Sequence, residues 1–186
     1  DEIRELEERV RRILDELRRL VERNREVIER SIRELEKLLD RDHMVLHEYV
    51  NAAGITTRRG GDDKKTMLDD VRRLLREAED HSRRSSETAK RIHRENEEHS
   101  KDSSRKVRKL IEELRELAKK VEKEITDERV KEAIKELVKD VDRVMREVDR
   151  ANRELTKTSK KVLEDVDRTN RRLVKEVRDV VERARK

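Results

Sequence analysis

Histidine is the residue type in this chain whose spacing most directly suggests chemistry. His43 and His47 are four positions apart, the spacing at which two imidazoles on one face of a helix bind a metal ion. No third ligand accompanies them, so we predict neither a metal site nor a cofactor. His81, His93 and His99 are too widely spaced to surround one ion. If these three are buried as neutral rings, their protonation at roughly pH 5–6 would instead provide a pH switch.

Enzymatic chemistry is not indicated by any other group of residues. The chain has no cysteine and only three glycines, so it lacks a thiol nucleophile and a glycine-rich phosphate loop. No hydroxyl residue is paired with a base in a recognisable catalytic arrangement. Adjacent acids such as Glu112 and Glu113 lie in highly charged sequence, where solvated surface is the ordinary interpretation. We therefore predict that the protein is not an enzyme.

The composition is that of long, packed helices. Of 186 residues, 53% are charged, 31% are hydrophobic and 1% are aromatic, and Pro, Cys, Trp and Phe are all absent. High charge with few apolar residues also occurs in disordered chains, but here the apolar residues recur at regular intervals, which favours helices. Strong helix formers occupy most other positions, and in this respect the chain resembles computationally designed helical bundles.

Positive and negative charges are evenly mixed along the sequence. The 52 basic and 47 acidic residues give a net charge of +5, and their alternation is typical of helix surfaces with ion pairs three and four positions apart. No nucleic-acid partner is expected, because a one-sided basic stripe and stacking aromatics are missing. No apolar run approaches the roughly 20 residues of a membrane span, and no signal peptide is recognisable. We expect a soluble, synthetic protein with no native compartment that is compatible with cytoplasmic expression.

Apolar residues three and four positions apart predict three long helices. The first is predicted over about 2–53, followed by a loop at 54–62 that begins with Gly54. The second and third are predicted over about 63–125 and about 128–185. Short connections between helices of about 60 residues imply antiparallel neighbours. The predicted fold is therefore all-α, a long antiparallel up-down-up three-helix bundle with coiled-coil-like packing in a single domain.

Several positions along the helical seams are polar rather than apolar. Folding the predicted helices at their turns places Asn24 opposite His93 and Ser159, and His99 opposite Asn152. We therefore predict buried hydrogen-bond layers that fix the register of the helices. A pH switch is the alternative role of the histidines among them. The polar positions are Asn24, Ser31, Ser85, His93, Asn96, His99, Asn152, Ser159 and Asn170.

One segment differs in composition from the rest of the chain. It contains two of the five histidines, one of the three methionines, the only tyrosine and one of the three glycines. A foreign segment in a uniform background suggests an installed functional element. Its residues are Arg41, Asp42, His43, Met44, Val45, Leu46, His47, Glu48, Tyr49, Val50, Asn51, Ala52, Ala53, Gly54, Ile55 and Thr56.

This segment, residues 41–56, resembles at every position the eleventh, C-terminal strand of the green fluorescent protein barrel, in the solubility-engineered form used as the small half of a split reporter. The resemblance is confined to this segment, and the rest of the barrel is absent. It implies a partner, the large fragment of split green fluorescent protein, which the segment would complete by adding the missing strand. It also implies that Glu48 assists chromophore maturation, and only in the reconstituted barrel.

The segment is compatible with two secondary structures. As a strand, it places Met44, Leu46 and Val50 on one face. As a helix, it continues the seam of the first helix, with only Asp42 poorly suited to that position. The helix is favoured, because a first helix that ended at Asp40 would leave the ends of the other two without a partner. We therefore predict a caged state, in which the bundle holds the segment as a helix; an unstructured loop is the alternative.

Two functions remain open from the sequence. The first is a conformational switch that presents or cages the reporter strand, with a strand availability set by the strength of the cage. The second is an inert scaffold or hetero-oligomer subunit that only carries the segment. Such a subunit would accept a fourth helix, from a designed helix or a second designed chain. Apolar positions beside the seam, such as Val138, Val144 and Leu163, are consistent with that groove.

Overall fold

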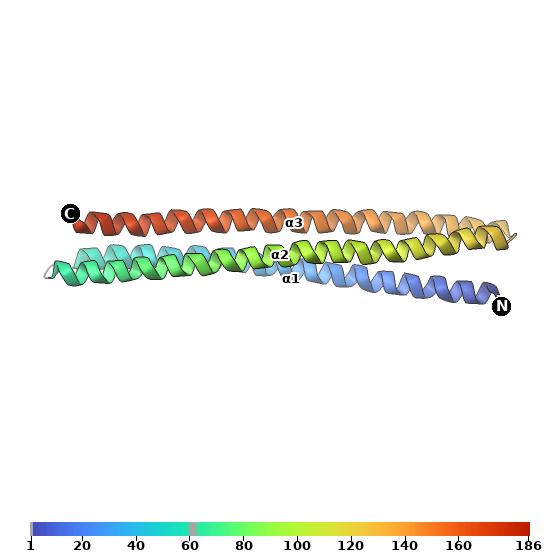
Figure 1. Ribbon diagram of the computed structural model, residues 1–186, viewed down its shortest axis with the longest axis horizontal. Helices are drawn as coiled ribbons and strands as arrows, with labels where there is room; N and C mark the ends of the chain where they lie inside the picture. Colours follow the sequence, from blue (N-terminus) through green and yellow to red (C-terminus); the bar gives the residue numbers. More distant parts are fainter. Residues whose placement is uncertain (1, 60–62) are drawn as a thin grey trace. The chain divides into compact units, whose positions relative to one another are not determined.

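Three long α-helices make up nearly all of the protein. The computed structural model describes residues 2–59 and 63–186. The helices are α1 (Glu2–Arg59), α2 (Lys64–Glu124) and α3 (Glu128–Arg185), as Figure 1 shows. The predicted all-α, antiparallel three-helix architecture is confirmed.

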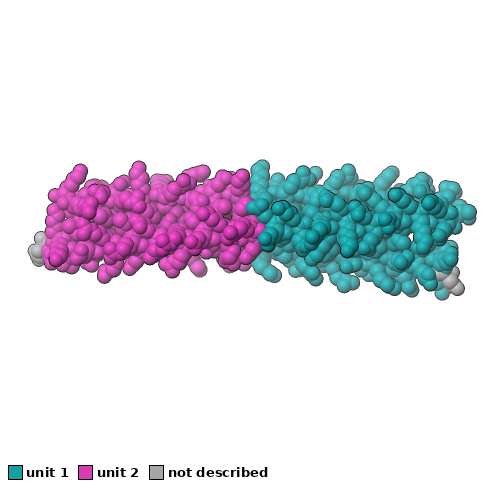
Figure 2. Space-filling view, viewed as in Figure 1, with its two compact units in different colours: residues 1–30, 96–157 teal, residues 31–95, 158–186 magenta. Residues whose placement is uncertain are grey.

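The chain divides into two compact units, each built from one segment of every helix. Unit 1 comprises residues 1–30 and 96–157, and unit 2 comprises residues 31–95 and 158–186 (Figure 2). The sequence shows no boundary between them, because the same three helices pass through both units. The core of unit 1 contains Ile13, Leu17, Val107, Leu110, Ile111, Leu114, Val141 and Val148. The core of unit 2 contains Leu46, Ala53, Val71, Ala78, Leu173, Val177 and Val181.

Acidic caps determine where α2 and α3 begin. The Asp63 carboxylate accepts hydrogen bonds from the backbone N–H groups of Lys65 at 3.1 Å and Thr66 at 3.4 Å. Asp127 accepts a bond from the N–H of Arg129 at 3.0 Å. A carboxylate in this position satisfies free N–H groups and interacts favourably with the positive end of the helix dipole.

The turn between α1 and α2 begins later than predicted. The loop expected at 54–62 is wrong in its first part, because α1 continues through Gly54 and ends at residue 59. Gly54 has no positive φ, and the hydroxyls of Thr56 and Thr57 donate to carbonyls of the preceding turn, each at 2.8 Å. Core packing of the same helix offsets the helix-propensity cost of glycine, about 1 kcal/mol. Residues 60–62, which the loop prediction also covers, lie outside the described residues.

Replacing Gly54 with alanine should therefore stabilise the protein. A Cβ at this position would meet only the Arg58 side chain, at 4.0 Å. The substitution should raise the free energy of unfolding by about 1 kcal/mol, the difference in helix propensity between alanine and glycine. Urea denaturation of the two chains measures the difference. A lower stability for Gly54→Ala would show that this position is not an ordinary helix interior.

The later turn also changes which residues of α1 and α2 lie opposite one another. Its centre moves along the chain by roughly three residues, which shifts the pairing by roughly six, or about 9 Å along the helix axis. Asn24 consequently contacts His99. The predicted partner, His93, was wrong. The alignment of α2 with α3 depends on the other turn, and there the predicted pairing of His93 with Ser159 is confirmed.

Candidate functional site

Residues 41–56 are helical throughout and form part of α1 in unit 2. Asp42, Leu46 and Ala53 face the interior, with 1%, 0% and 0% of their surface exposed. These three lie four and seven positions apart, which places them along one stripe of a helix. The predicted helical state of the segment is confirmed, and the alternative of an unstructured loop is wrong for these residues.

The opposite face of the segment is exposed to solvent. Met44 is 65% exposed and Ile55 is 48% exposed. The remaining members of the exposed face are Arg41, His43, His47, Glu48 and Asn51. The half-buried flanks are Val45, Tyr49, Val50, Ala52, Gly54 and Thr56.

This arrangement is incompatible with the strand form of the same residues. In a strand, side chains two positions apart share a face, so Met44 and Leu46 would point in the same direction. In α1 they do not: Met44 lies in solvent and Leu46 is fully buried. Strand formation therefore requires that α1 unwind here and that Leu46 and Ala53 leave the core of unit 2.

Side chains from both other helices hold the segment in place. Leu46 and Ala53 belong to one apolar cluster with Val71 of α2 and Val177 of α3. Half-buried Tyr49 packs against the same cluster, and its ring lies 6.5 Å from the imidazole of His81, centroid to centroid. Burial of each large apolar side chain contributes about 2 kcal/mol, so the cluster stabilises the segment in its helical form.

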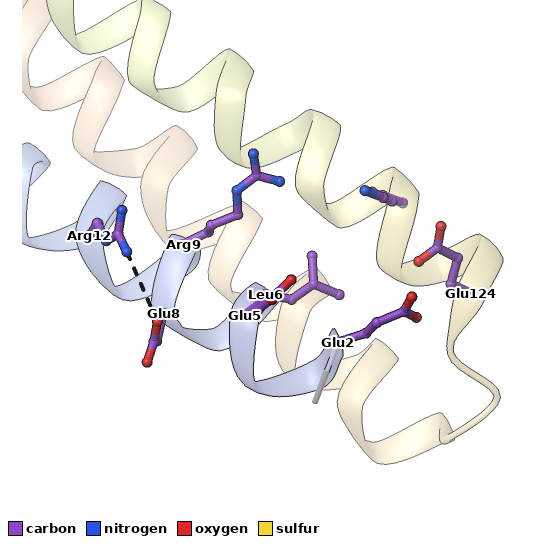
Figure 3. Close-up of a pocket in the computed structure, with 8 residues that line it drawn as sticks. Glu2, Glu5, Leu6, Glu8, Arg9, Arg12 and Glu124 are labelled. Atoms are coloured by element: carbon purple, nitrogen blue, oxygen red, sulfur yellow. Dashed lines mark ion pairs between the residues drawn. The ribbon is translucent and has the colours of Figure 1, made fainter.

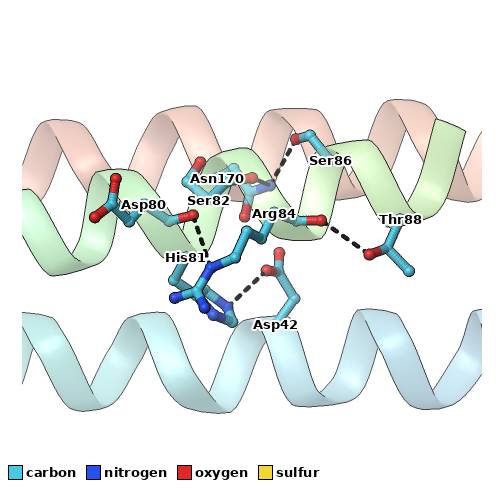
Figure 4. Close-up of polar contacts among 8 residues, drawn as sticks. All are labelled: Asp42, Asp80, His81, Ser82, Arg84, Ser86, Thr88 and Asn170. Carbon is cyan, nitrogen blue, oxygen red and sulfur yellow. Dashed lines mark hydrogen bonds and ion pairs between the residues drawn. The ribbon is translucent and has the colours of Figure 1, made fainter.

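Asp42 is the one charged residue of the segment that is buried. Its carboxylate oxygen Oδ1 lies 3.2 Å from Nε2 of His81 (Figure 4), but neither group forms a well-aligned hydrogen bond. Burial raises the pKa of Asp42 above the ordinary carboxyl range, and the neighbouring Ser85 hydroxyl and His81 oppose that rise. The sequence predicted a polar role for Ser85 and a poor seam fit for Asp42; the structure adds that they share a layer with His81.

In unit 1, a buried polar layer centres on Asn24. The amide oxygen of Asn24 is 2.7 Å from Nε2 of His99 and accepts a hydrogen bond from the Ser103 hydroxyl at 2.9 Å. Both contacts cross from α1 to α2, so they fix the register of these helices. Asn96, another predicted network residue, is also buried in this unit.

A second layer of unit 1 joins α2 to α3. The Asn152 amide donates to the Ser100 carbonyl at 3.2 Å and to the Ser104 hydroxyl at 2.9 Å. The Ser100 hydroxyl in turn donates to the Asn152 carbonyl at 3.3 Å. His99, the predicted partner of Asn152, faces Asn24 instead. Ser104 was missed because it lies one position away from the seam. Ser100 lies on the seam, four positions after Asn96 and three before Ser103, so the spacing could have identified it.

Other residues of the predicted polar set form hydrogen bonds in unit 2. The Asn170 amide donates to the Ser82 carbonyl at 3.0 Å and to the Ser86 hydroxyl at 2.9 Å (Figure 4). Nδ1 of His93 lies 2.8 Å from the Ser159 hydroxyl. Ser31 is buried as well. The prediction of buried Ser and Asn networks is thus confirmed.

The Asn24 layer should weaken in acid. Burial lowers the pKa of His99, and Lys106 acts in the same direction while Asp102 opposes it. Unfolding restores the ordinary imidazole pKa of about 6.5, so the unfolded chain binds the proton more readily and stability falls as the pH drops below that value. Urea midpoints at about pH 7.5 and about pH 5 should therefore differ less in His99→Gln than in the unchanged chain. If the two midpoints differed by the same amount in both chains, His99 would not be the source of the acid sensitivity.

The surface of unit 1 has grooves between its helices near the chain's N-terminal end. One of about 560 Å³ lies between α1 and the end of α2 and is lined by charged residues, including Glu2, Arg9 and Glu124 (Figure 3). Another of about 460 Å³ lies between α1 and α3 and is mostly apolar, with Leu6 and Ile134 in its lining. Neither brings together a nucleophile and a base.

The described residues contain no arrangement that suggests metal binding. No group of three or more His, Cys, Asp or Glu side chains is placed to hold an ion in residues 2–59 and 63–186. His43 and His47 both lie on the exposed face of α1. None of the three helices, in their described parts, has an apolar stretch long enough to cross a membrane.

Comparison with known proteins finds similarity only at the level of structure. A solved structure described as a computationally designed three helix bundle is similar, with 17% sequence identity and a TM-score of 0.45; the match covers 98% of this chain and 88% of that one. No protein-family model matches the sequence. No curated protein is significantly similar to it.

Proposed function

We propose that this chain is a designed helical bundle that holds residues 41–56 as a helix and yields them, as a strand, to the large fragment of a split green fluorescent protein. The observation that carries the proposal is the burial of Leu46 and Ala53 in the core of unit 2. The polar residues opposite Asp42 add support, because His81 and Ser85 lie where a seam would otherwise be apolar. An inert carrier would need no such match to a residue of the segment.

The proposed mechanism is competition between two conformations of one sequence. In the closed state, the segment is part of α1; in the open state, it is free to pair with the edge strands of the barrel fragment. The fragment binds only the open state, so its apparent affinity falls by the fraction of molecules that are open. The apolar cluster around Leu46 sets that fraction.

Fluorescence would arise only in the complex. The resemblance assigns Glu48 a role beside the chromophore of the completed barrel. Chromophore formation of this family requires a Tyr-Gly pair, and the only tyrosine here, Tyr49, precedes Val50. The chain supplies a strand and one carboxylate, and the large fragment supplies the chromophore.

Complementation after unfolding tests whether the segment can act as this strand. The chain is unfolded in urea, diluted into excess large fragment and followed by green fluorescence. We expect a signal that Leu46→Asp/Val50→Asp abolishes, because both residues lie on the strand face that would line the barrel. If the unfolded and diluted chain gives no fluorescence while the free peptide of residues 41–56 does, the proposed function is wrong.

One observation favours a second function, a subunit that accepts another helix. Unit 1 has the apolar groove of about 460 Å³ between α1 and α3, and Ile3 beside it is 52% exposed. Val138, Val144 and Leu163 are half-buried on α3. Light scattering over a range of concentrations separates the two functions: self-association favours the subunit, and a monomer throughout favours the single-chain cage.

A further inference from the structure

The contact between Asp42 and His81 joins the segment to the helix that covers it. Asp42 lies in the segment on α1, and His81 lies on α2; Figure 4 shows their side chains directed toward each other. Asp42 is 1% exposed, and its two carboxylate oxygens and Nε2 of His81 are buried without an aligned hydrogen bond. The hydroxyl of Ser85, also buried, has no aligned partner either.

The number of protons on this pair determines its electrostatic cost. A carboxylate facing a neutral imidazole leaves one uncompensated negative charge in the layer, and an unpaired buried charge is strongly unfavourable. One proton on the carboxyl removes that charge. It also supplies an O–H donor, and Nε2 of His81 lies within reach of it at 3.2 Å. The closed layer therefore favours one bound proton.

We propose that the Asp42–His81 pair is a proton-dependent latch, which tightens the hold of the bundle on residues 41–56 in mild acid and loosens it as the pH rises. The inference rests on the proposed function, because release of the segment is the event that the latch controls. In the open state, both side chains are in water and no longer share a buried layer. The closed and open states thus differ in proton affinity, which is the condition for pH to shift their populations.

The direction follows from the carboxyl group. Burial raises the pKa of Asp42 in the closed state, ahead of the opposing effects of Ser85, His81 and His43. The open state has the ordinary carboxyl pKa of about 3.9. The raised pKa of Asp42 therefore stabilises the closed state fully below that value. This stabilisation is lost as the pH rises through the raised pKa of the closed state.

Charged or titratable groups flank the latch on α1 and α2, and a neutral amide flanks it on α3. On α1, His43 acts on Asp42 through its charge, and Tyr49 lies beside the His81 ring. On α2, Asp80 and Arg84 are exposed and are joined by a bond from the Arg84 side chain to the Asp80 carbonyl at 3.4 Å. α3 contributes the neutral amide of Asn170, which bonds to Ser82 and Ser86.

The latch opposes the effect of acid on unit 1. Acid weakens the Asn24 layer because burial lowers the pKa of His99, whereas it strengthens the Asp42 layer of unit 2. Global unfolding exposes both groups, so its pH dependence combines the two opposite contributions, whereas release of the segment follows the Asp42 layer. This difference separates a local latch from a general loss of stability.

Capture by the large barrel fragment, measured as mass bound to an immobilised fragment, tests the latch without depending on fluorescence. At each pH, each chain is compared with a free peptide that has the same segment sequence. The ratio removes the pH dependence of binding between the free segment and the fragment. From about pH 4.5 to about pH 8, the capture rate of the chain relative to the peptide should rise, by up to about tenfold for each unit by which burial raises the pKa of Asp42. Asp42→Asn, similar in shape but without a titrating group, should remove most of this rise, and His99→Gln in unit 1 should retain it.

A second measurement keeps the latch separate from the proposed function. Hydrogen-exchange protection factors of the amides of residues 42–53 should fall from about pH 4.5 to about pH 8 in the unchanged chain and stay nearly constant in Asp42→Asn. If the free peptide binds the fragment but the unfolded chain does not, the proposed function fails while the exchange result still decides the latch. Protection that is flat or rising with pH in the unchanged chain, or an equal fall in Asp42→Asn, would overturn the latch.

Discussion

Val177→Asp is expected to increase the rate at which the large barrel fragment captures residues 41–56 by about a hundredfold. Val177 of α3 is fully buried in the cluster that contains Leu46 and Ala53. An aspartate there would place an uncompensated charge against the segment, at a cost of about 3 kcal/mol, and each 1.4 kcal/mol is about tenfold in the open population. Fluorescence on mixing with the fragment measures the rate.

The matched control for this result is Val148→Asp. Val148 is similarly buried on α3 but belongs to the core of unit 1, away from the segment. Circular dichroism confirms that each variant remains helical. If both variants released the segment equally, the effect would reflect general unfolding; if neither changed the rate, the segment would not be caged by unit 2.

The second large effect is expected for Asn24→Leu, which should lower the free energy of unfolding by about 3 kcal/mol. The Asn24 amide oxygen is the shared partner of His99 and Ser103. Its removal leaves the buried Ser103 hydroxyl and the half-buried His99 ring without that partner, and each unsatisfied buried group costs about 1–3 kcal/mol. Urea denaturation at neutral pH measures the loss.

Replacing all three members of the layer should reverse that loss. In Asn24→Leu/His99→Leu/Ser103→Ala, no polar group is left unsatisfied, and apolar replacement of a whole polar network is often neutral or stabilising. We expect the triple variant to be at least as stable as the unchanged chain and to lose the acid sensitivity due to His99. A triple variant as unstable as Asn24→Leu alone would show that packing, rather than hydrogen bonding, determines the cost.

The helices could be predicted from sequence because their apolar spacing is regular and, apart from Gly54, nothing in their interiors competes with it. The alignment of α2 with α3 was also predictable, since the connection is short and its two possible cap residues, Thr126 and Asp127, are adjacent; Asp127 is the cap. The pairing of α1 with α2 was not predictable, because Gly54 is compatible with both a helix end and a helix interior. Glycine ends many helices, but it is tolerated within one when core packing continues on both sides.

The layer around Asp42 was predictable only in part. Seam spacing identified Asp42 as unsuited to a core position and located His81 beside the seam of α2. Their contact depends on the register of α1 against α2, which the misplaced turn shifted. A sequence pattern specifies which face a residue occupies, whereas cross-helix partners require that the turn be placed to within one residue.

The capture rate of the unchanged chain, relative to the free peptide of residues 41–56 at equal concentration, tests the central claim most directly. The chain and the peptide are each mixed with the large barrel fragment at neutral pH, and the appearance of fluorescence is followed. Since the fragment can bind only molecules whose segment has left the bundle, we predict a rate at least about a hundredfold slower for the chain. Equal rates would contradict the account, because they would mean that burial of Leu46 and Ala53 does not restrain the segment.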